Sequence, residues 1–135
     1  MEFVRLQELL ESSLTTADSP NNLFGNIDDD FWFWLHTEGY RSNSELQRVL
    51  PAMPDEDVQV RLTGSKGDRT LSEGFQAYKL FKRLFEENVG RLATCEGVLD
   101  FGCGWGRILR FFLKDLEPSK LWGTNMMAFH IDACK

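Results

Sequence analysis

The stretch that decides the fold is Val98-Leu99-Asp100-Phe101-Gly102-Cys103-Gly104-Trp105-Gly106-Arg107. Its apolar start favours a short β-strand, and its glycines at alternate positions favour a tight loop. The residues after it show the spacing of a helix that packs on one face, with Trp105, Ile108, Leu109, Phe112, Leu113 and Leu116. The stretch therefore predicts a strand, a glycine loop and a helix. In α/β proteins such a junction places a nucleotide-like ligand at the carboxyl end of the strand.

A second strand and a further helix are expected after this unit. Pro118 lies just past the end of the first helix, residues 121–124 form a short apolar run, and residues 126–135 favour a helix. A helical crossover of this length joins parallel neighbours in a sheet. We therefore expect an α/β fold, with a β-α-β-α unit over residues 95–135 and a helical region over residues 1–94.

The helical region divides into separate amphipathic segments. Apolar spacing predicts helices over residues 3–14, 31–38, 45–50 and 71–88. Residues 55–62 are ambiguous, because Val58, Val60 and Leu62 alternate as in a strand, but Pro54 and Gly64 at the two ends favour a helix. Gly39 is interpreted as a helix stop, and capping boxes are expected at Ser44-Glu45-Leu46-Gln47 and at Thr70-Leu71-Ser72-Glu73. The core face of the longest helix is predicted to consist of Ala77, Leu80, Phe81, Leu84 and Phe85, and Phe75 and Tyr78 are expected to extend this apolar stripe.

Two segments could have a role in binding, although a structural role is the simpler interpretation of each. The aromatic run over residues 31–35 is expected to pack in the core, with the wall of a ligand pocket as the alternative. His36 has no Cys, His or acid at metal-ligand spacing, so it is interpreted as structural or exposed. The polar stretch over residues 63–69 lacks the spacing of a phosphate loop and is expected to be a connector.

Composition limits the partners. The chain has 135 residues, enough for one modest domain, and a net charge of −6. Residues 1–60 carry twelve acids and three bases, so nucleic acid and anionic membranes are disfavoured as partners. No apolar run approaches the length of a membrane span. Three cysteines without metal-ligand spacing fit a reduced, cytoplasmic setting.

The glycine spacing distinguishes between classes of ligand. A dinucleotide-binding turn would require a glycine at position 107, where this chain has arginine, so a nicotinamide or flavin enzyme is disfavoured. Glycines at 102, 104 and 106 instead predict a ledge without side chains, suited to a ligand that packs on the backbone. Asp100, at the end of the strand, could engage a positive group on that ligand.

On these residues the sequence resembles the class I S-adenosylmethionine-dependent methyltransferases, because Val98 to Gly106 matches the first motif of that family. The resemblance implies a Rossmann-like sheet and S-adenosylmethionine as the cofactor. Gly102, Gly104 and Gly106 would line its methionine and ribose portion, and Asp100 would lie under its amino group. Phe101, Cys103 and Asn125 complete the implied cofactor-binding residues.

Two departures from the family pattern qualify what the resemblance implies. The family has an acid at the position of Asn125, and an asparagine cannot accept both ribose hydroxyl protons as a carboxylate does. The family's sheet is also larger, with helices on both faces, whereas two strands are predicted here. We therefore expect an N-terminal fragment with an incomplete domain, inactive by itself, whose exposed sheet edge could pair with another copy.

Two functional hypotheses follow. The first is the N-terminal part of a methyltransferase, and the alternative is a non-catalytic helical interaction or assembly module that carries a remnant methyltransferase-like unit. No residue of the sequence indicates the methyl acceptor or a general base.

Overall fold

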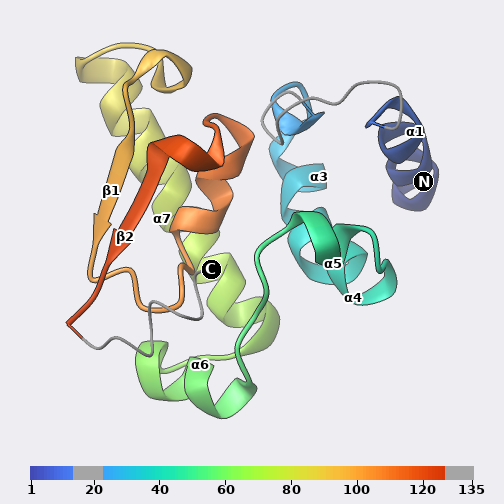
Figure 1. Cartoon of the computed structure of the whole chain (residues 1–135), viewed down its shortest axis with the longest axis horizontal. Coiled ribbons are helices and arrows are strands. Elements are labelled where there is room, and N and C mark those ends of the chain that lie inside the picture. Colours follow the sequence, from blue (N-terminus) through green and yellow to red (C-terminus); the bar gives the residue numbers. More distant parts are fainter. Residues whose placement is uncertain (14–22, 127–135) are drawn as a thin grey trace.

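The computed structural model describes residues 1–13 and 23–126, which form a mixed fold of helices and strands (Figure 1). The N-terminal part contains α1 (Glu2–Ser13), α3 (Asp29–Trp34), the π-helical turn η1 (Leu35–Gly39), α4 (Tyr40–Ser42), α5 (Leu46–Val49), α6 (Glu56–Thr63) and α7 (Gly67–Asn88). It is followed by the 3-10 turn η2 (Leu92–Thr94), β1 (Val98–Phe101), the 3-10 helices η3 (Leu109–Lys114) and η4 (Pro118–Lys120), and β2 (Leu121–Thr124). Apart from Met126, the helix expected over residues 126–135 lies outside the described residues.

Both predicted strands are confirmed, and they pair in parallel. Val98 is opposite Leu121, and Phe101 is opposite Thr124. The two strands run side by side toward the end of the molecule at which α6 lies (Figure 1). One face of this sheet is covered by η3, because a Cβ on Gly123 would lie 3.5 Å from a methyl carbon of Leu109.

The connection between the strands differs from the α-helix expected from Trp105 onward. The chain turns through Ile108 and then forms the 3-10 helix η3. The carbonyl oxygen of Phe111 accepts a hydrogen bond from the buried indole Nε1 of Trp32 at 3.1 Å. The amide of Asp115, which would bond to that oxygen in an α-helix, donates instead to the oxygen of Phe112 at 3.0 Å. The hydrogen bond from Trp32 thus coincides with the tighter 3-10 winding of η3.

The aromatic run lies in the core, as its simpler interpretation predicted. Asp28 caps α3, because its carboxylate accepts a hydrogen bond from the amide of Phe31 at 2.8 Å. Trp32 and Leu35 are fully buried. Gly39 was wrongly interpreted as a stop, since the helical path continues to Ser42. A Cβ on Gly39 would lie 2.8 Å from the ring of Trp34, so the glycine permits close packing.

Helices α5 and α7 also start differently from the expected capping boxes. Asn43, not Ser44, accepts hydrogen bonds from the amides of Glu45 and Leu46, at 2.9 and 3.0 Å. Helix α6 ends at Gly64, whose φ of +75° is typical of a C-terminal glycine, and this confirms the helix predicted there. Helix α7 begins at Gly67, so the second capping box was wrong.

Helix α7 buries only one side of the predicted apolar stripe, the side that includes Phe75 and Tyr78. Its buried positions are Thr70, Leu71, Gly74, Phe75 and Tyr78. Leu80, Phe81 and Leu84, which were predicted to be core, are 43–50% exposed. The structure therefore leaves an apolar stripe of α7 in contact with solvent.

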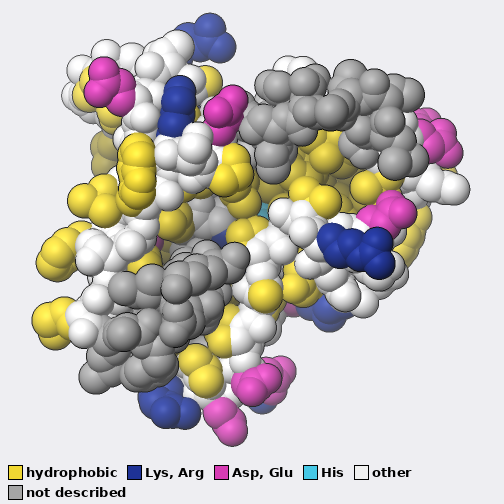
Figure 2. Space-filling model, in the orientation of Figure 1, with side chains coloured by type: hydrophobic (Ala, Val, Ile, Leu, Met, Phe, Trp, Pro, Cys, Tyr) yellow, Lys and Arg dark blue, Asp and Glu magenta, His cyan; other side chains and the backbone are white. Residues whose placement is uncertain are grey.

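The uncovered face of the sheet is also apolar. Leu99, Phe101 and Trp122 are 52–85% exposed. In Figure 2 hydrophobic side chains project at the left margin, over the strands.

The hydrophobic core is continuous. Core residues from both the helical region and the strand-containing region form one cluster, from Leu6 of α1 to Leu116 after η3. Among the described helices, none combines the length and apolar character that a bilayer crossing requires.

Candidate functional site

The glycine loop turns through backbone conformations that only glycine adopts readily. The φ angles are +83° at Gly102, +58° at Gly104 and +80° at Gly106. A Cβ on Gly102 or Gly104 would meet no atom within 4 Å. The first two glycines are therefore required for the path of the backbone, and open space lies beside them.

Hydrogen bonds attach this loop to the end of β2. The amides of Gly102 and Cys103 both donate to the carbonyl oxygen of Thr124, at 2.7 and 3.1 Å. Cys103 is buried against β2, where a Cβ on Gly123 would lie 2.6 Å from its Sγ. The thiol thus fills space beneath the loop. Because Asn125 directly follows Thr124, the same contacts bring it to the loop.

A cavity of about 340 Å³ opens at this junction, and we call it the glycine-loop cavity. Of the residues predicted from the sequence, it is lined by Asp100, Gly102, Cys103, Gly104 and Asn125. The remaining wall consists of residues outside the implied cofactor-binding set, namely Leu62, Thr63, Trp105, Arg107, Ile108 and Met126.

Two predicted residues lie elsewhere. Phe101 is 85% exposed and belongs to the uncovered face of the sheet, because side chains alternate along a strand. Gly106 lines a separate cavity of about 460 Å³ between α5 and η3, which we call the α5–η3 cavity. Neither residue contributes to the wall of the glycine-loop cavity.

Asp100 is the acidic group of the glycine-loop cavity. It is half-buried, and this burial raises the pKa of its carboxyl group. Within the described part of the chain, its carboxylate takes part in no hydrogen bond or ion pair. A half-buried carboxylate without a partner is stabilised by a cation that enters the cavity, because an opposite charge offsets the cost of desolvation.

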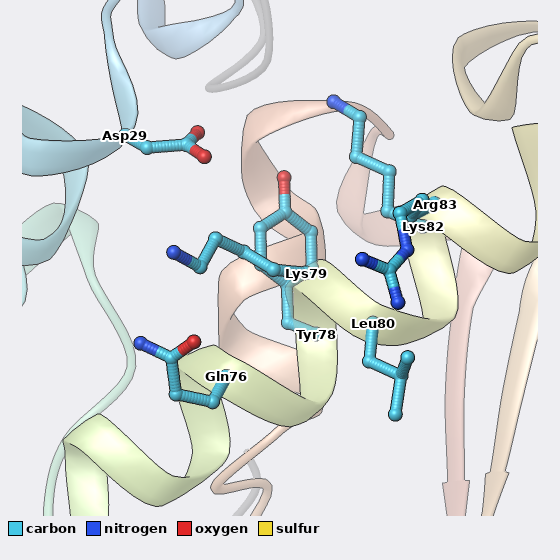
Figure 3. Close-up of a pocket in the computed structure, with 7 residues that line it drawn as sticks. All are labelled: Asp29, Gln76, Tyr78, Lys79, Leu80, Lys82 and Arg83. Atoms are coloured by element: carbon cyan, nitrogen blue, oxygen red, sulfur yellow. The ribbon is translucent and has the colours of Figure 1, made fainter.

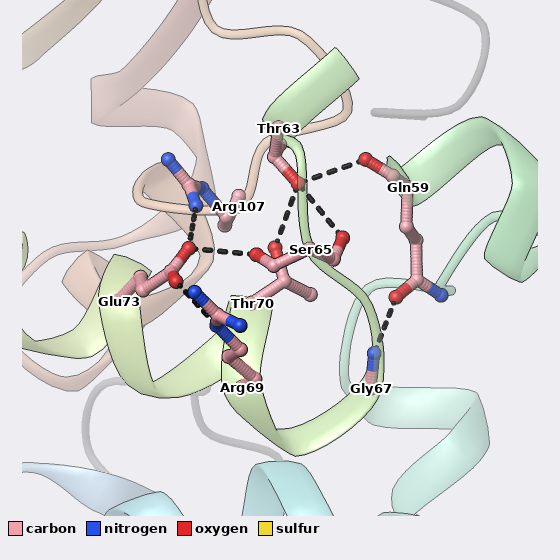
Figure 4. Close-up of polar contacts among 8 residues, drawn as sticks. All are labelled: Gln59, Thr63, Ser65, Gly67, Arg69, Thr70, Glu73 and Arg107. Atoms are coloured by element: carbon pink, nitrogen blue, oxygen red, sulfur yellow. Dashed lines mark hydrogen bonds and ion pairs between the residues drawn. The ribbon is translucent and has the colours of Figure 1, made fainter. Parts of the chain in front are cut away.

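The connector between α6 and α7 holds one wall of the cavity in place (Figure 4). Glu73 accepts hydrogen bonds from Ser65 at 2.7 Å, from Arg69 at 3.1 Å and from Arg107 at 3.0 Å. The bonds from Ser65 and Arg69 lower the pKa of Glu73. Thr63, itself in the wall, shares a 3.0 Å hydrogen bond with Thr70. The connector predicted from the sequence is thus tied to the glycine loop through side chains.

Sequence reasoning could not find the contribution of α6. Leu62 and Thr63 reach the cavity by tertiary packing, and no local pattern around them indicates a ligand. Arg107 was considered only as the residue that replaces a third glycine. Its ion pair with Glu73, 34 positions earlier in the chain, has no signal in the sequence.

A larger hollow of about 570 Å³ lies on α7, away from the glycine loop (Figure 3). Its charged groups pair with neighbouring residues. Asp115 accepts hydrogen bonds from Tyr78 at 2.6 Å and Lys82 at 2.5 Å, and Asp29 accepts one from Lys114 at 2.7 Å. Burial and the charge of Asp115 raise the pKa of Tyr78 above its ordinary value. These pairings indicate a structural role for this charge cluster.

In residues 1–13 and 23–126, no group of three or more His, Cys, Asp or Glu side chains could hold a metal ion. His36 is fully buried, which agrees with a structural role. No protein-family model, curated protein or solved structure matches this chain. Its function is therefore inferred from its own residues.

Proposed function

We propose that this chain carries the cofactor-binding part of an S-adenosylmethionine-dependent methyltransferase, with the cofactor in the glycine-loop cavity. One observation carries the proposal. Asp100, at the end of β1, lines an open glycine loop without a partner of its own in the described chain, and Asn125 joins it from the end of the neighbouring strand. On this proposal, the two parallel strands are the first pair of a Rossmann-like sheet.

The charge of the site fits this cofactor. S-adenosylmethionine has a positive sulfur and an ammonium group but no phosphate, and Asp100 would hold the ammonium group. A dinucleotide would instead need backbone amides for its pyrophosphate. The amides of Gly102 and Cys103 are already bonded to Thr124. This arrangement favours a cationic ligand over a phosphorylated one.

Asn125 would face the ribose of the cofactor. Its side chain offers one carbonyl acceptor, so it cannot accept from both hydroxyls as a carboxylate does. The lost charge-assisted hydrogen bond corresponds to about 1–2 kcal/mol, or roughly tenfold in affinity. We therefore expect the chain to bind the cofactor weakly.

The cofactor, when bound, supplies a methyl group on a positively charged sulfur that a substrate nucleophile can attack in line. The residues of this chain would hold that group in position, and positioning is itself an effective source of catalysis. Asp100 would orient the amino-acid end, and the glycine loop would allow the cofactor to approach the backbone. These residues do not identify the chemical class of the methyl acceptor.

Calorimetry with S-adenosylmethionine on the 135-residue chain tests the proposal. We expect weak binding that Asp100→Asn decreases by about tenfold or more, because a charge-assisted contact is lost. Asp57→Asn, the same change on the exposed surface of α6, is the matched control and should leave affinity unchanged.

A substitution that adds a carboxylate at position 125 gives a sharper test. Asn125→Asp should increase affinity by about tenfold, by restoring the second acceptor oxygen. A gain of affinity cannot arise from loss of folding. No binding by the chain, together with none by Asn125→Asp, would contradict the proposal.

A second candidate is an interaction module that self-associates, and one observation favours it. Leu99, Phe101 and Trp122 are exposed on a sheet whose outer edge on β1 has no neighbouring strand within the described chain. An edge strand of this kind pairs readily with a second copy. Light scattering should then show a dimer that Phe101→Lys converts to monomer, whereas a monomeric chain would exclude this candidate.

A further inference from the structure

The α5–η3 cavity has a buried positive charge in its wall. Arg110 is 3% exposed and lines the cavity. Its Nε donates to Nδ1 of His36 at 3.1 Å, and its Nη2 donates to the carbonyl oxygen of Pro51 at 2.6 Å. Burial lowers the pKa of Arg110 to about 10, so the guanidinium stays charged at neutral pH. No ion pair joins it to a carboxylate among the described residues.

The buried polar atoms without a partner around this charge are all hydrogen-bond donors. Nη1 of Arg110 and Nε1 of Trp105 are both unpaired in the described chain. Burial and the charge of Arg110 lower the pKa of His36 well below 6.5, so its ring is neutral. Because Nδ1 of His36 accepts from Arg110, the ring proton is on Nε2, which is also unpaired. The cluster therefore has an excess of donors and needs an acceptor.

Two of these donors belong to side chains that line the same cavity, although the donor atoms themselves are buried. The guanidinium carbon of Arg110 lies 5.7 Å from the centre of the Trp105 ring, and both residues line the cavity. Most of the remaining wall is apolar and includes Val49, Leu50, Pro51, Leu109, Leu113 and Leu121. A volume of about 460 Å³ lies within the usual range of small-molecule sites.

We propose that the α5–η3 cavity binds a small organic acid, with its carboxylate held by Arg110 and Trp105 and its apolar body against the aliphatic wall. A carboxylate offers two acceptor oxygens and one negative charge, which matches two unpaired donors and one guanidinium. Exposed Arg48 also lines the cavity, but Arg110 is the buried positive charge among its described lining residues, and a phosphate dianion would carry more charge than that guanidinium balances. Asp100 and Asn125 do not line this cavity, so the two proposals are tested separately, although Trp105 lies in the wall of both cavities.

Calorimetry with octanoate on the 135-residue chain tests this site, with octanol as the neutral ligand of the same length. We expect octanoate to bind at least about tenfold more tightly than octanol, because the carboxylate gains charge-assisted hydrogen bonds. Inorganic phosphate should not compete. In an amide NMR spectrum, octanoate should move the indole proton signal of Trp105, which is identified as the signal absent from Trp105→Phe.

Variants separate the site from general effects on folding. Trp105→Phe keeps an aromatic side chain and removes the indole donor, so it should weaken octanoate binding several-fold and affect octanol less. Arg110→Gln, if folded, should make octanoate and octanol bind alike, whereas Asp100→Asn should change neither. Equal affinities for octanoate and octanol in the unmodified chain, or no binding and no shift of the Trp105 signal, would overturn the proposal even if S-adenosylmethionine binds.

Discussion

Gly74 of α7 lies directly against the backbone of Arg107. A Cβ placed on Gly74 would lie 2.7 Å from the carbonyl oxygen of Arg107, closer than real Cβ contacts. Arg107 is part of the wall of the glycine-loop cavity. The longest helix of the chain therefore supports the loop through a position at which no side chain fits.

The first prediction concerns this contact. Gly74→Ala should lower the free energy of unfolding by about 1–3 kcal/mol through overpacking, despite a gain of up to about 1 kcal/mol in helix propensity. Urea denaturation measures the difference. Gln76→Ala, at an exposed position of the same helix, is the control and should change stability by no more than about 0.5 kcal/mol. A Gly74→Ala chain more stable than the parent would show that α7 does not pack on the loop.

The second prediction tests which face of α7 is buried. Leu71 is 1% exposed, whereas Leu84 is 46% exposed. Leu71→Ala should cost about 2–5 kcal/mol, because it leaves a cavity in the core. Leu84→Ala should lower the free energy of unfolding by well under half of that amount. Thermal and urea unfolding of both variants would reveal a wrong assignment if Leu84→Ala were the more damaging substitution.

The shift of the buried face of α7 shows where sequence reasoning reaches its limit. Apolar residues lie on more than one side of this helix, so periodicity alone supports either Leu80 and Leu84 or Leu71 and Phe75 as the core. The choice is made by partners distant in the chain. Phe111 lies 5.0 Å from Phe75 between ring centres, and it comes from η3. The helix itself was predictable, but its packing partner was not.

The same division holds for the candidate site. Asp100 and the first two loop glycines could be predicted because a strand, an acid and glycines are local features of the sequence. Asn125 could be predicted because the family resemblance implies a cofactor-binding residue at the end of the second strand. Leu62 could not, since only the packing of α6 brings it to the cavity. Local sequence patterns thus identified the strand-end and loop residues of the cavity, whereas tertiary packing brought the residues of α6 to it.

The third prediction concerns pH and His36. Burial lowers the pKa of His36 in the folded chain, with a smaller contribution from the charge of Arg110. As the pH falls through 6.5, the unfolded chain binds a proton that the folded chain does not, so stability decreases below that pH. His36→Asn should remove about 1 kcal/mol of the stability change between pH 7 and pH 5.5, measured by urea unfolding. An unchanged pH dependence in His36→Asn would mean that the ring titrates normally.

The last prediction concerns the contact between α7 and the end of η3. The phenol of Tyr78 donates to Oδ2 of Asp115 at 2.6 Å, and Lys82 donates to Oδ1 at 2.5 Å. Because Asp115 has only 9% of its side chain exposed, these bonds are shielded from water. In a double-mutant cycle with Tyr78→Phe and Asp115→Asn, the coupling energy should lie between about 0.5 and 3 kcal/mol. Pairing Asp115→Asn with Arg83→Gln on the exposed side of α7 should give a value near zero. If the Tyr78 cycle also gave zero, this hydrogen bond would not contribute to holding α7 against η3, and the apolar contacts of Tyr78 with Phe111 and Phe112 would account for its burial.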